Sequence, residues 1–252
     1  MVRGVDVKAN KKKMNSTVNE PQTERQVPEV SHNLRDQRLG PKGRKTREKL
    51  LTTAFNMLAS SSDMPIILSN VAREASVALT TLYLYFPDIG ELLLAVLDRV
   101  MDSAEEAFID RLRRRWPDAS LQNSCFDFLL AHYQFWRRHS RVLLMRNSLA
   151  DSGDIRFVKY RYQLSSQPLI QLLVLQMDSE LERENKRCWR IANLLLTGIE
   201  RTATILSTPI WNTWHDESGV FTDEESFIES IRIEAELMAL TISHQRKIEK
   251  TR

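Results

Sequence analysis

The stretch IILSNVAREASVALTTLYLYF, residues 66–86, constrains the fold of this chain more than any other part of its sequence. Its apolar and small residues recur at the intervals of two short helices, at about 68–75 and 79–86. Residues 76–78 would form a tight turn between them, and the small side chain of Ala72 would let the two helices approach closely. Two helices joined in this way form a helix-turn-helix, whose second helix has the dimensions to enter the major groove of DNA.

The segments on either side of this stretch also have helical patterns. Before it, one apolar stripe covers residues 50–58. After it, Pro87 stops the preceding helix, and Asp88 with Glu91 three residues later is an Asp-x-x-Glu helix start. We expect a long helix from there to the basic sequence RLRRRW at 111–116, because cations suit a helix C-terminus. This helix would connect the N-terminal part of the chain to the rest.

The rest of the chain is predicted to be a bundle of helices. The expected helices cover 119–139, 141–150, 154–183, 185–206 and 223–248. No segment alternates convincingly as a strand, and 7 Gly and 8 Pro are too few for the many turns of a β-rich chain. The sequence therefore predicts an all-α fold with a three-helix head and a C-terminal helical bundle.

The net charge of +3 conceals an uneven distribution. The first fifty residues hold 13 Lys or Arg and 6 Asp or Glu, whereas the remainder holds 23 and 27. Residues 1–34 have no apolar periodicity, so we interpret them as a solvated, disordered tail. From Arg35 onward the basic residues adjoin the first helix, where they could neutralise phosphates and release counterions.

The sequence NVAREASVALTTLYLYFPDIGELLLAVL resembles the DNA-binding segment of the TetR/AcrR family of bacterial transcriptional regulators. The resemblance covers roughly Arg44 to Val100. It implies a DNA-binding head, a long connecting helix, and an all-helical body for ligand binding and dimerisation. The implied parts are a disordered basic arm at 1–41, the helix-turn-helix domain at 42–88, and the effector-binding and dimerisation domain at 89–252.

Nine residues are predicted to contact DNA. Thr80, Thr81, Tyr83 and Tyr85 occupy positions that contact DNA in the family, although packing in the head is an equal alternative for Tyr85. Hydroxyl groups would donate to phosphate oxygens, and Leu79 could meet a thymine methyl group. The full predicted set is Arg44, Lys45, Arg47, Ser69, Leu79, Thr80, Thr81, Tyr83 and Tyr85.

The sequence departs from the family pattern at several positions. Ser76 stands where the turn glycine is usual, which suggests a strained turn or one that tolerates a side chain. Ile67 and Ala78 occupy positions where Thr and Ser usually cap a helix, so two helix N-termini lose a side-chain acceptor. Ile89 replaces a common Lys and removes one expected phosphate contact.

The last two predicted helices, CWRIANLLLTGIERTATIL and ESFIESIRIEAELMALTI, are the most continuously apolar. They resemble the dimerising pair of the family, so we expect a homodimer formed through these helices. One short recognition helix reads few base pairs, whereas a two-fold dimer places two of them about 34 Å apart on a near-palindrome.

Aromatic side chains are concentrated in the body. They suggest a pocket for a small apolar or amphiphilic effector, and the alternative is an ordinary helical core. The predicted effector-binding residues are Phe128, His132, Trp136, Tyr162, Asn193 and Thr197. Trp211 and Trp214 lie in a Pro- and Gly-containing connection that could cover such a pocket or contact a dimer partner.

No motif of catalysis or cofactor binding is present, so an enzyme is not expected, and no cofactor or metal is predicted. His132 and His139 share one helical face but lack a third ligand, and neither Cys125 nor Cys188 has metal-site spacing. Without a signal peptide or a long apolar run, we expect a cytoplasmic protein with no membrane partner.

The function predicted from the sequence is that of a sequence-specific DNA-binding transcriptional regulator. It would act as a repressor that a small effector releases from a near-palindromic double-stranded operator. The alternatives are a regulator controlled by a protein partner and a helical enzyme without a recognisable motif.

Overall fold

The computed structural model describes residues 39–60, 64–179, 186–208 and 224–251, and every regular element in these ranges is helical. The α-helices are α1 (Pro41–Ala59), α2 (Leu68–Glu74), α3 (Leu79–Leu82), α4 (Ile89–Asp102), α5 (Asp110–Arg113), α6 (Leu121–Arg138), α7 (Ser140–Asp151), α8 (Ile155–Lys159), α9 (Gln167–Gln176), α10 (Lys186–Ser207) and α12 (Glu224–Lys250). Two π-helices, η1 (Glu105–Ile109) and η3 (Tyr160–Ser166), and a 3₁₀ turn, η2 (Asp118–Ser120), complete them. The predicted all-α fold is confirmed, while most of the predicted arm and the Trp211–Trp214 segment lie outside the described residues.

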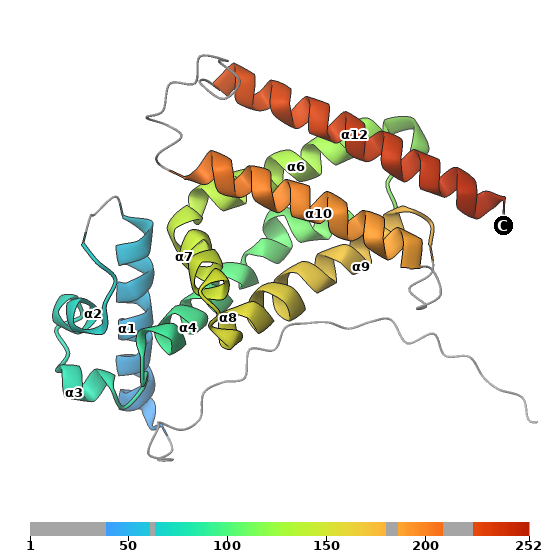
Figure 1. Cartoon of the computed structure of the whole chain (residues 1–252). Helices are drawn as coiled ribbons and strands as arrows, with labels where there is room; N and C mark the ends of the chain where they lie inside the picture. The colour runs from blue at the N-terminus through green and yellow to red at the C-terminus, as the bar shows by residue number, and fades with distance from the viewer. Residues whose placement is uncertain (1–38, 61–63, 180–185, 209–223, 252) are drawn as a thin grey trace, which may run out of the picture.

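Helices α1, α2 and α3 form a head at one end of the molecule, at the lower left of Figure 1. Its core contains Leu50, Val71, Leu82 and Phe86, each at most 2% exposed. Helix α1 begins at Pro41, earlier than the apolar stripe alone indicates, because proline at the first helical position costs no hydrogen bond.

The turn between α2 and α3 is a Schellman motif. The amide of Val77 donates to the carbonyl of Ala72 (2.9 Å), and the amide of Ser76 donates to that of Arg73 (3.0 Å). Ser76 itself has φ of +50°, in the left-handed region that favours glycine. The departure from glycine noted in the sequence therefore places a side chain on a strained backbone.

Helix α3 is shorter than predicted. It ends at Leu82, and the chain continues in tight turns in which the amide of Tyr85 donates to the carbonyl of Leu82 (2.9 Å). The predicted end at Phe86 is wrong, since the helix ends four residues earlier; Pro87 accounts only for Phe86, because a residue before proline is disfavoured in the α region. The second helix of the motif is therefore a single turn followed by an irregular extension.

The connector predicted as one long helix is interrupted. Helix α4 ends at Asp102, and after Ser103 the chain enters the π-helix η1 and then α5. The hydroxyl of Ser103 donates to the carbonyl of Val100 (2.7 Å), and such hydroxyl bonds compete with regular helix hydrogen bonding. The interruption brings the buried Phe108 against the aromatic row of α6, with ring centroids 5.2 Å from Phe135.

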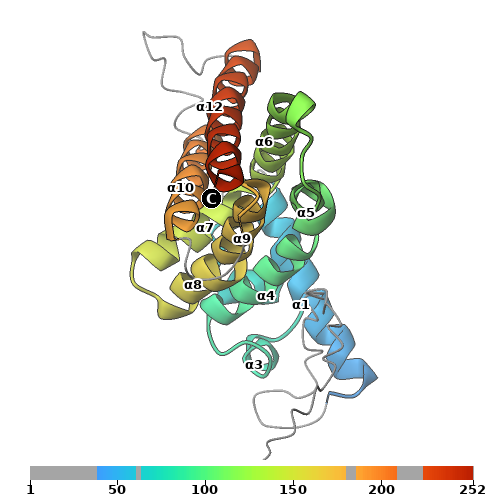
Figure 2. The ribbon, with the colours of Figure 1, turned by 90° about the vertical axis from the view of Figure 1, so that its right-hand side faces the viewer.

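The body surrounds α6, which packs against α10 and α12 (Figures 1 and 2). The helix predicted at 154–183 is instead α8, η3 and α9, which ends at Gln176, and residues 180–185 lie outside the described ranges. The other predicted body helices correspond to α6, α7, α10 and α12. None of the helices described has the combination of length and apolar character needed to cross a membrane.

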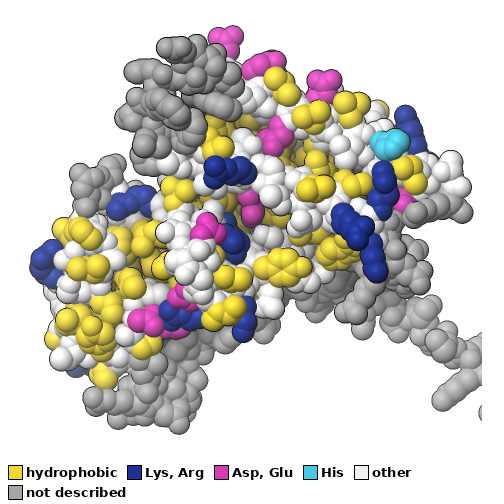
Figure 3. Space-filling model, viewed as in Figure 1, with side chains coloured by type: hydrophobic (Ala, Val, Ile, Leu, Met, Phe, Trp, Pro, Cys, Tyr) yellow, Lys and Arg dark blue, Asp and Glu magenta, His cyan; other side chains and the backbone are white. Residues whose placement is uncertain are grey.

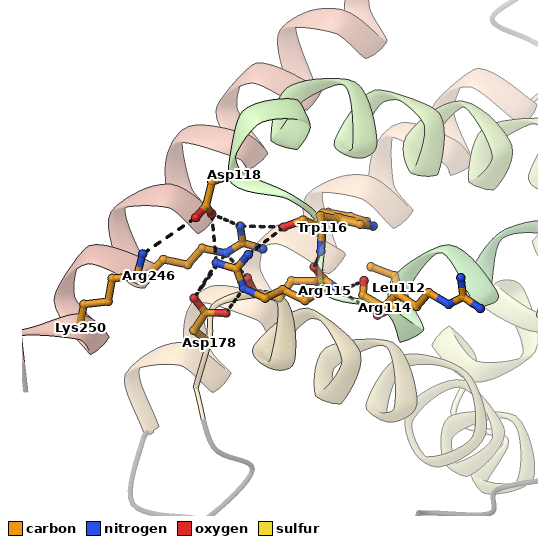
Figure 4. Close-up of polar contacts among 9 residues, drawn as sticks. Leu112, Arg114, Arg115, Trp116, Asp118, Asp178, Arg246 and Lys250 are labelled. Atoms are coloured by element: carbon orange, nitrogen blue, oxygen red, sulfur yellow. Dashed lines mark hydrogen bonds and ion pairs between the residues drawn. The ribbon is translucent and has the colours of Figure 1, made fainter.

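The end of α12 is fastened to the end of the connector (Figure 4). Arg246 has a side chain only 3% exposed. Its Nε donates to the carbonyl of Gln176 (2.7 Å), and its Nη1 donates to the carbonyl of Trp116 (3.0 Å) and to the carboxylate of Asp118 (2.5 Å). Helices α5, α9 and α12 are thus held together at one end of the body.

Replacing Ser76 by glycine should stabilise the head. Glycine removes the Cβ penalty of the left-handed backbone, so we expect the free energy of unfolding to rise by about 1 kcal/mol. Urea unfolding measures this change. The matched control is Ser148→Gly in the exposed part of α7, which should lower the same free energy by about 0.5 kcal/mol. An unchanged or lower stability for Ser76→Gly would contradict the strained turn.

Candidate nucleic-acid interface

Helices α2 and α3 lie on the side of the head away from the body (Figure 1), and several residues of the predicted DNA set on these helices are exposed. Leu79 is 37% exposed and Tyr83 is 47% exposed, and Thr80 is also exposed. Ser69 on α2 is exposed, whereas Thr81 is half-buried. Since Leu82 faces the core, α3 presents Leu79, Thr80 and the adjoining Tyr83 outward.

Basic side chains cover the first half of α1. Lys42, Arg44, Lys45 and Lys49 are exposed, and the first turn of this helix contains no acidic residue. The Nε of Arg44 donates to the carbonyl of Leu39 (3.2 Å). Cations at the positive end of a helix dipole cost stability, so this arrangement is suited to an anionic partner rather than to the helix itself.

Arg47 and Tyr85 belong to the packing of the head. The Arg47 guanidinium carbon lies 5.2 Å from the centroid of the Phe86 ring, and burial lowers the pKa of Arg47. Tyr85 packs against the core, and a Cβ atom placed on Gly43 would lie 3.5 Å from its hydroxyl. Both side chains join the start of α1 to the segment after α3, and their contact with DNA stays a prediction.

The helix N-termini of the head differ in their caps. Neither Ile67, before α2, nor Ala78, before α3, supplies a side-chain hydrogen bond. Before α4, the carboxylate of Asp88 accepts from the amide of Glu91 (2.9 Å), as the Asp-x-x-Glu pattern predicted. Helix α1, which follows Gly40, has no side-chain cap either, so all three helices of the head leave their first amides to other partners.

The six predicted effector-binding residues do not come together. Phe128, His132 and Trp136 are at most 3% exposed and lie in the core. The His132 ring stands edge-on to Phe108 with centroids 5.0 Å apart, so neighbouring rings fill this space. The other three residues, Tyr162, Asn193 and Thr197, are exposed. The structure thus separates the set, because the sequence pattern identifies apolar faces but not which of them meet.

A small hollow lies instead between the head and the body. It measures about 10 Å³, which is the space of about one water molecule. Its lining residues are Phe55, Leu58, Ala59, Val96, Arg138, His139 and Val142. A hollow of this size cannot hold the apolar or amphiphilic effector that the sequence suggested.

The interior of the body also contains charged groups. Arg146 is 2% exposed, and its Nη2 donates to the side-chain oxygen of Asn147 (3.0 Å). Its guanidinium carbon lies 5.4 Å from the ring centroid of Trp136. Burial lowers the pKa of Arg146 and raises that of Glu200, despite the attraction between the two charges. These contacts anchor α7 inside the body.

Within the described ranges, no group of three or more His, Cys, Asp or Glu side chains is placed to hold a metal ion.

An apolar face on α10 and α12 was not identified residue by residue from the sequence. Its members, which we call the α10–α12 face, are 55–70% exposed: Leu194, Ile233, Leu237 and Leu240. Figure 3 shows hydrophobic side chains over this part of the molecule. The three α12 residues have the spacing of one helical stripe. This stripe is hard to recognise in the sequence because the same helix carries a second, buried apolar stripe.

No family model matches the chain, and no curated protein matches it. Among the solved structures that match is a TetR-like transcriptional regulator from Rhodococcus sp. RHA1. The two sequences are 19% identical, the match covers 79% of this chain and 96% of the other, and the TM-score is 0.48. At this identity the match concerns the course of the backbone, so the chemistry of the head has to come from its own residues.

His132 should make stability depend on pH. Burial, assisted by the charge of Arg146, lowers its pKa to about 3, below the unfolded value of about 6.5. Its contribution is therefore complete above about pH 6.5 and is lost as the pH falls toward 3, by at most about 1.4 kcal/mol per pH unit. Urea unfolding from pH 7 to pH 4 should show a shallower fall for His132→Phe than for the wild type. The exposed His244→Asn is the control, and an unchanged slope for His132→Phe would contradict the buried neutral ring.

Proposed function

We propose that this chain is a homodimeric, sequence-specific DNA-binding transcriptional regulator that represses by occupying a near-palindromic operator. The observation that carries the proposal is the juxtaposition of two surfaces on one end of the head. The basic start of α1 lies against the segment that directly follows the exposed Leu79, Thr80 and Tyr83, because Gly43 lies beside the Tyr85 hydroxyl and Arg47 lies on Phe86. Arg47 on Phe86 joins these two surfaces, so phosphate-binding charge and base-reading side chains have a fixed relation.

The chemistry of the side chains suggests which of them would contact phosphates and which would contact bases. Lys42, Arg44 and Lys45 would neutralise phosphates and release counterions, which gives affinity without sequence preference. The hydroxyls of Thr80 and Tyr83 would donate to phosphate oxygens and fix the register. The exposed Leu79 would contact a thymine methyl group in the major groove.

The α10–α12 face supports a dimer. Helices α10 and α12 lie side by side, and the Arg187 Nε near the start of α10 donates to the Gln245 side chain near the end of α12 (3.3 Å). Their outward apolar side chains would pack against the same face of a second copy, as in a two-fold interface. Asn193 and Thr197 belong to the exposed side of α10, so we assign them to this contact rather than to an effector.

The placement of the predicted effector residues limits where a small ligand could bind. Three of the six side chains pack in the core and three are exposed, so they do not form a common pocket. We therefore propose a regulator that does not bind a small ligand at these six residues.

Removing two exposed hydroxyls from the head should weaken operator binding. With an operator selected from genomic DNA fragments, Thr80→Ala combined with Tyr83→Phe should lose about 10- to 100-fold in affinity, because hydrogen bonds to charged phosphates disappear. Fluorescence anisotropy measures the affinity. The matched control removes exposed hydroxyls from the body by combining Tyr162→Phe with Thr251→Ala. Equal affinities for the two double variants would reject the DNA-facing assignment.

A charge in the α10–α12 face should dissociate the dimer. Two-fold symmetry would bury Leu237 twice, so Leu237→Glu should cost about 3 kcal/mol or more and raise the dimer dissociation constant at least about a hundredfold. Sedimentation equilibrium measures that constant. Leu175→Glu is the matched control, because Leu175 is also exposed but lies on α9. A Leu237→Glu protein that dimerises like the wild type would refute this interface.

A further inference from the structure

Helix α4 is bonded to the head as well as to the body. The Nη1 of Arg99 on α4 donates to the hydroxyl of Thr52 on α1 (3.1 Å), and its Nη2 pairs with Glu48 of the same helix. Helix α1 also packs directly against α4. The way the body holds α1 and α4 therefore decides how the head is oriented.

One arginine of the body holds the C-terminal end of α1. The Nη1 of Arg141, in α7, donates to the carbonyl oxygens of Met57 (2.9 Å) and Ser60 (2.5 Å). Carbonyls at the end of a helix have no partner within the helix, and a cation suits the negative end of its dipole. The Met57 carbonyl also accepts from the Ser60 hydroxyl (3.0 Å), so Arg141 joins α7 to a helix end that its own chain has already closed.

A second arginine holds the N-terminal end of α4. The Nη1 of Arg156, in α8, donates to the carboxylates of Asp88 (2.9 Å) and Glu91 (3.0 Å), and its Nη2 donates to Asp154 (2.8 Å). A Cβ atom on Gly90 would lie only 2.5 Å from that Nη2. The absence of a side chain at Gly90 therefore lets the guanidinium lie against the start of α4.

Both arginines come from one helical hairpin, α7 and α8. Its turn is closed by hydrogen bonds from the amide of Gly153 to the carbonyl of Ala150 (3.1 Å) and from the amide of Asp154 to that of Leu149 (3.0 Å). Gly153 has φ of +91°, which a residue with a side chain rarely adopts. The hollow of about 10 Å³ lies beside this hairpin, where Val142 of α7 lines it together with Phe55 and Leu58 of α1.

We propose that Arg141 and Arg156 are positioning residues that fix the orientation of the helix-turn-helix head on the body. In the dimer they set the separation of the two recognition helices and hence the spacing of half-sites that the protein accepts. This inference rests on the proposed function. A protein partner that displaces the α7–α8 hairpin would change operator affinity through these two contacts.

The first test measures spacing discrimination. Operators with the natural half-site spacing and with two added base pairs are compared for the wild type, Arg141→Ala and Arg156→Ala. Each variant should bind the natural operator about tenfold more weakly, and its preference for the natural spacing should fall toward 1. Binding to an isolated half-site should not change. Retained spacing preference overturns the proposal, and loss of half-site binding does so too, because it indicates a damaged head.

Two control variants test whether the effect on spacing preference is specific to the ion pair between Arg156 and Asp88. Asp88→Asn keeps an oxygen acceptor for the amide of Glu91 but removes the charge that Arg156 meets, so it should behave like Arg156→Ala. Arg161→Ala removes an exposed ion pair with Asp151 from the same region and should leave the spacing preference unchanged. A wild-type response from Asp88→Asn, or relaxed spacing from Arg161→Ala, would count against a specific role of Arg156.

A second test does not depend on DNA. Spin labels on Glu74→Cys in the head and Gln134→Cys in α6 report the distance between head and body, with labelled chains diluted in unlabelled ones. Both native cysteines are fully buried. The distance distribution should broaden in Arg141→Ala and Arg156→Ala, and an unchanged width overturns the proposal. If the wild type selects no operator, the proposed function fails, whereas this distance still decides whether the arginines position the head.

Discussion

The structure depends on the packing of the aromatic row of α6 against the π-helical part of the connector. Phe108 meets Phe128, His132 and Phe135 with ring centroids 5.0–6.2 Å apart. Buried rings each remove roughly 150–250 Å² from water, so a cluster of this kind contributes several kcal/mol to folding. This contact attaches the connector to the body, and the connector carries the head, so the placement of the head depends on it together with the contacts of Arg141 and Arg156.

The sequence correctly predicted several features that depend on residues close together in the chain. The Asp88 cap, the tight turn at Ser76 and the type and approximate bounds of most helices depend on residues close in sequence. Pro87 explains why Phe86 is not helical, but α3 already ends at Leu82, which the local pattern did not predict. The interruption of the connector could not be predicted from its stripe, since the partner of Phe108 lies on another helix.

In the candidate site, too, some features depend on residues close in sequence and others on contacts that only the fold creates. Leu79, Thr80 and Tyr83 are exposed as expected because their faces follow from helical spacing around Leu82. Arg47 belongs to the head's packing because of Phe86, which lies thirty-nine positions away in the sequence. The arginines of the α7–α8 hairpin carry no motif at all, since their partners are backbone carbonyls and carboxylates brought near by the fold.

The left-handed backbone at Ser76 has a consequence for the dynamics of the head. A residue held in a sparsely populated conformation stores free energy that is released when its surroundings open. The small core around Leu82 and the uncapped starts of α2 and α3 add little resistance to such opening. Amide protons of the helix-turn-helix should therefore exchange with solvent through local unfolding well before those of α6, so that the head samples open states while the body stays folded.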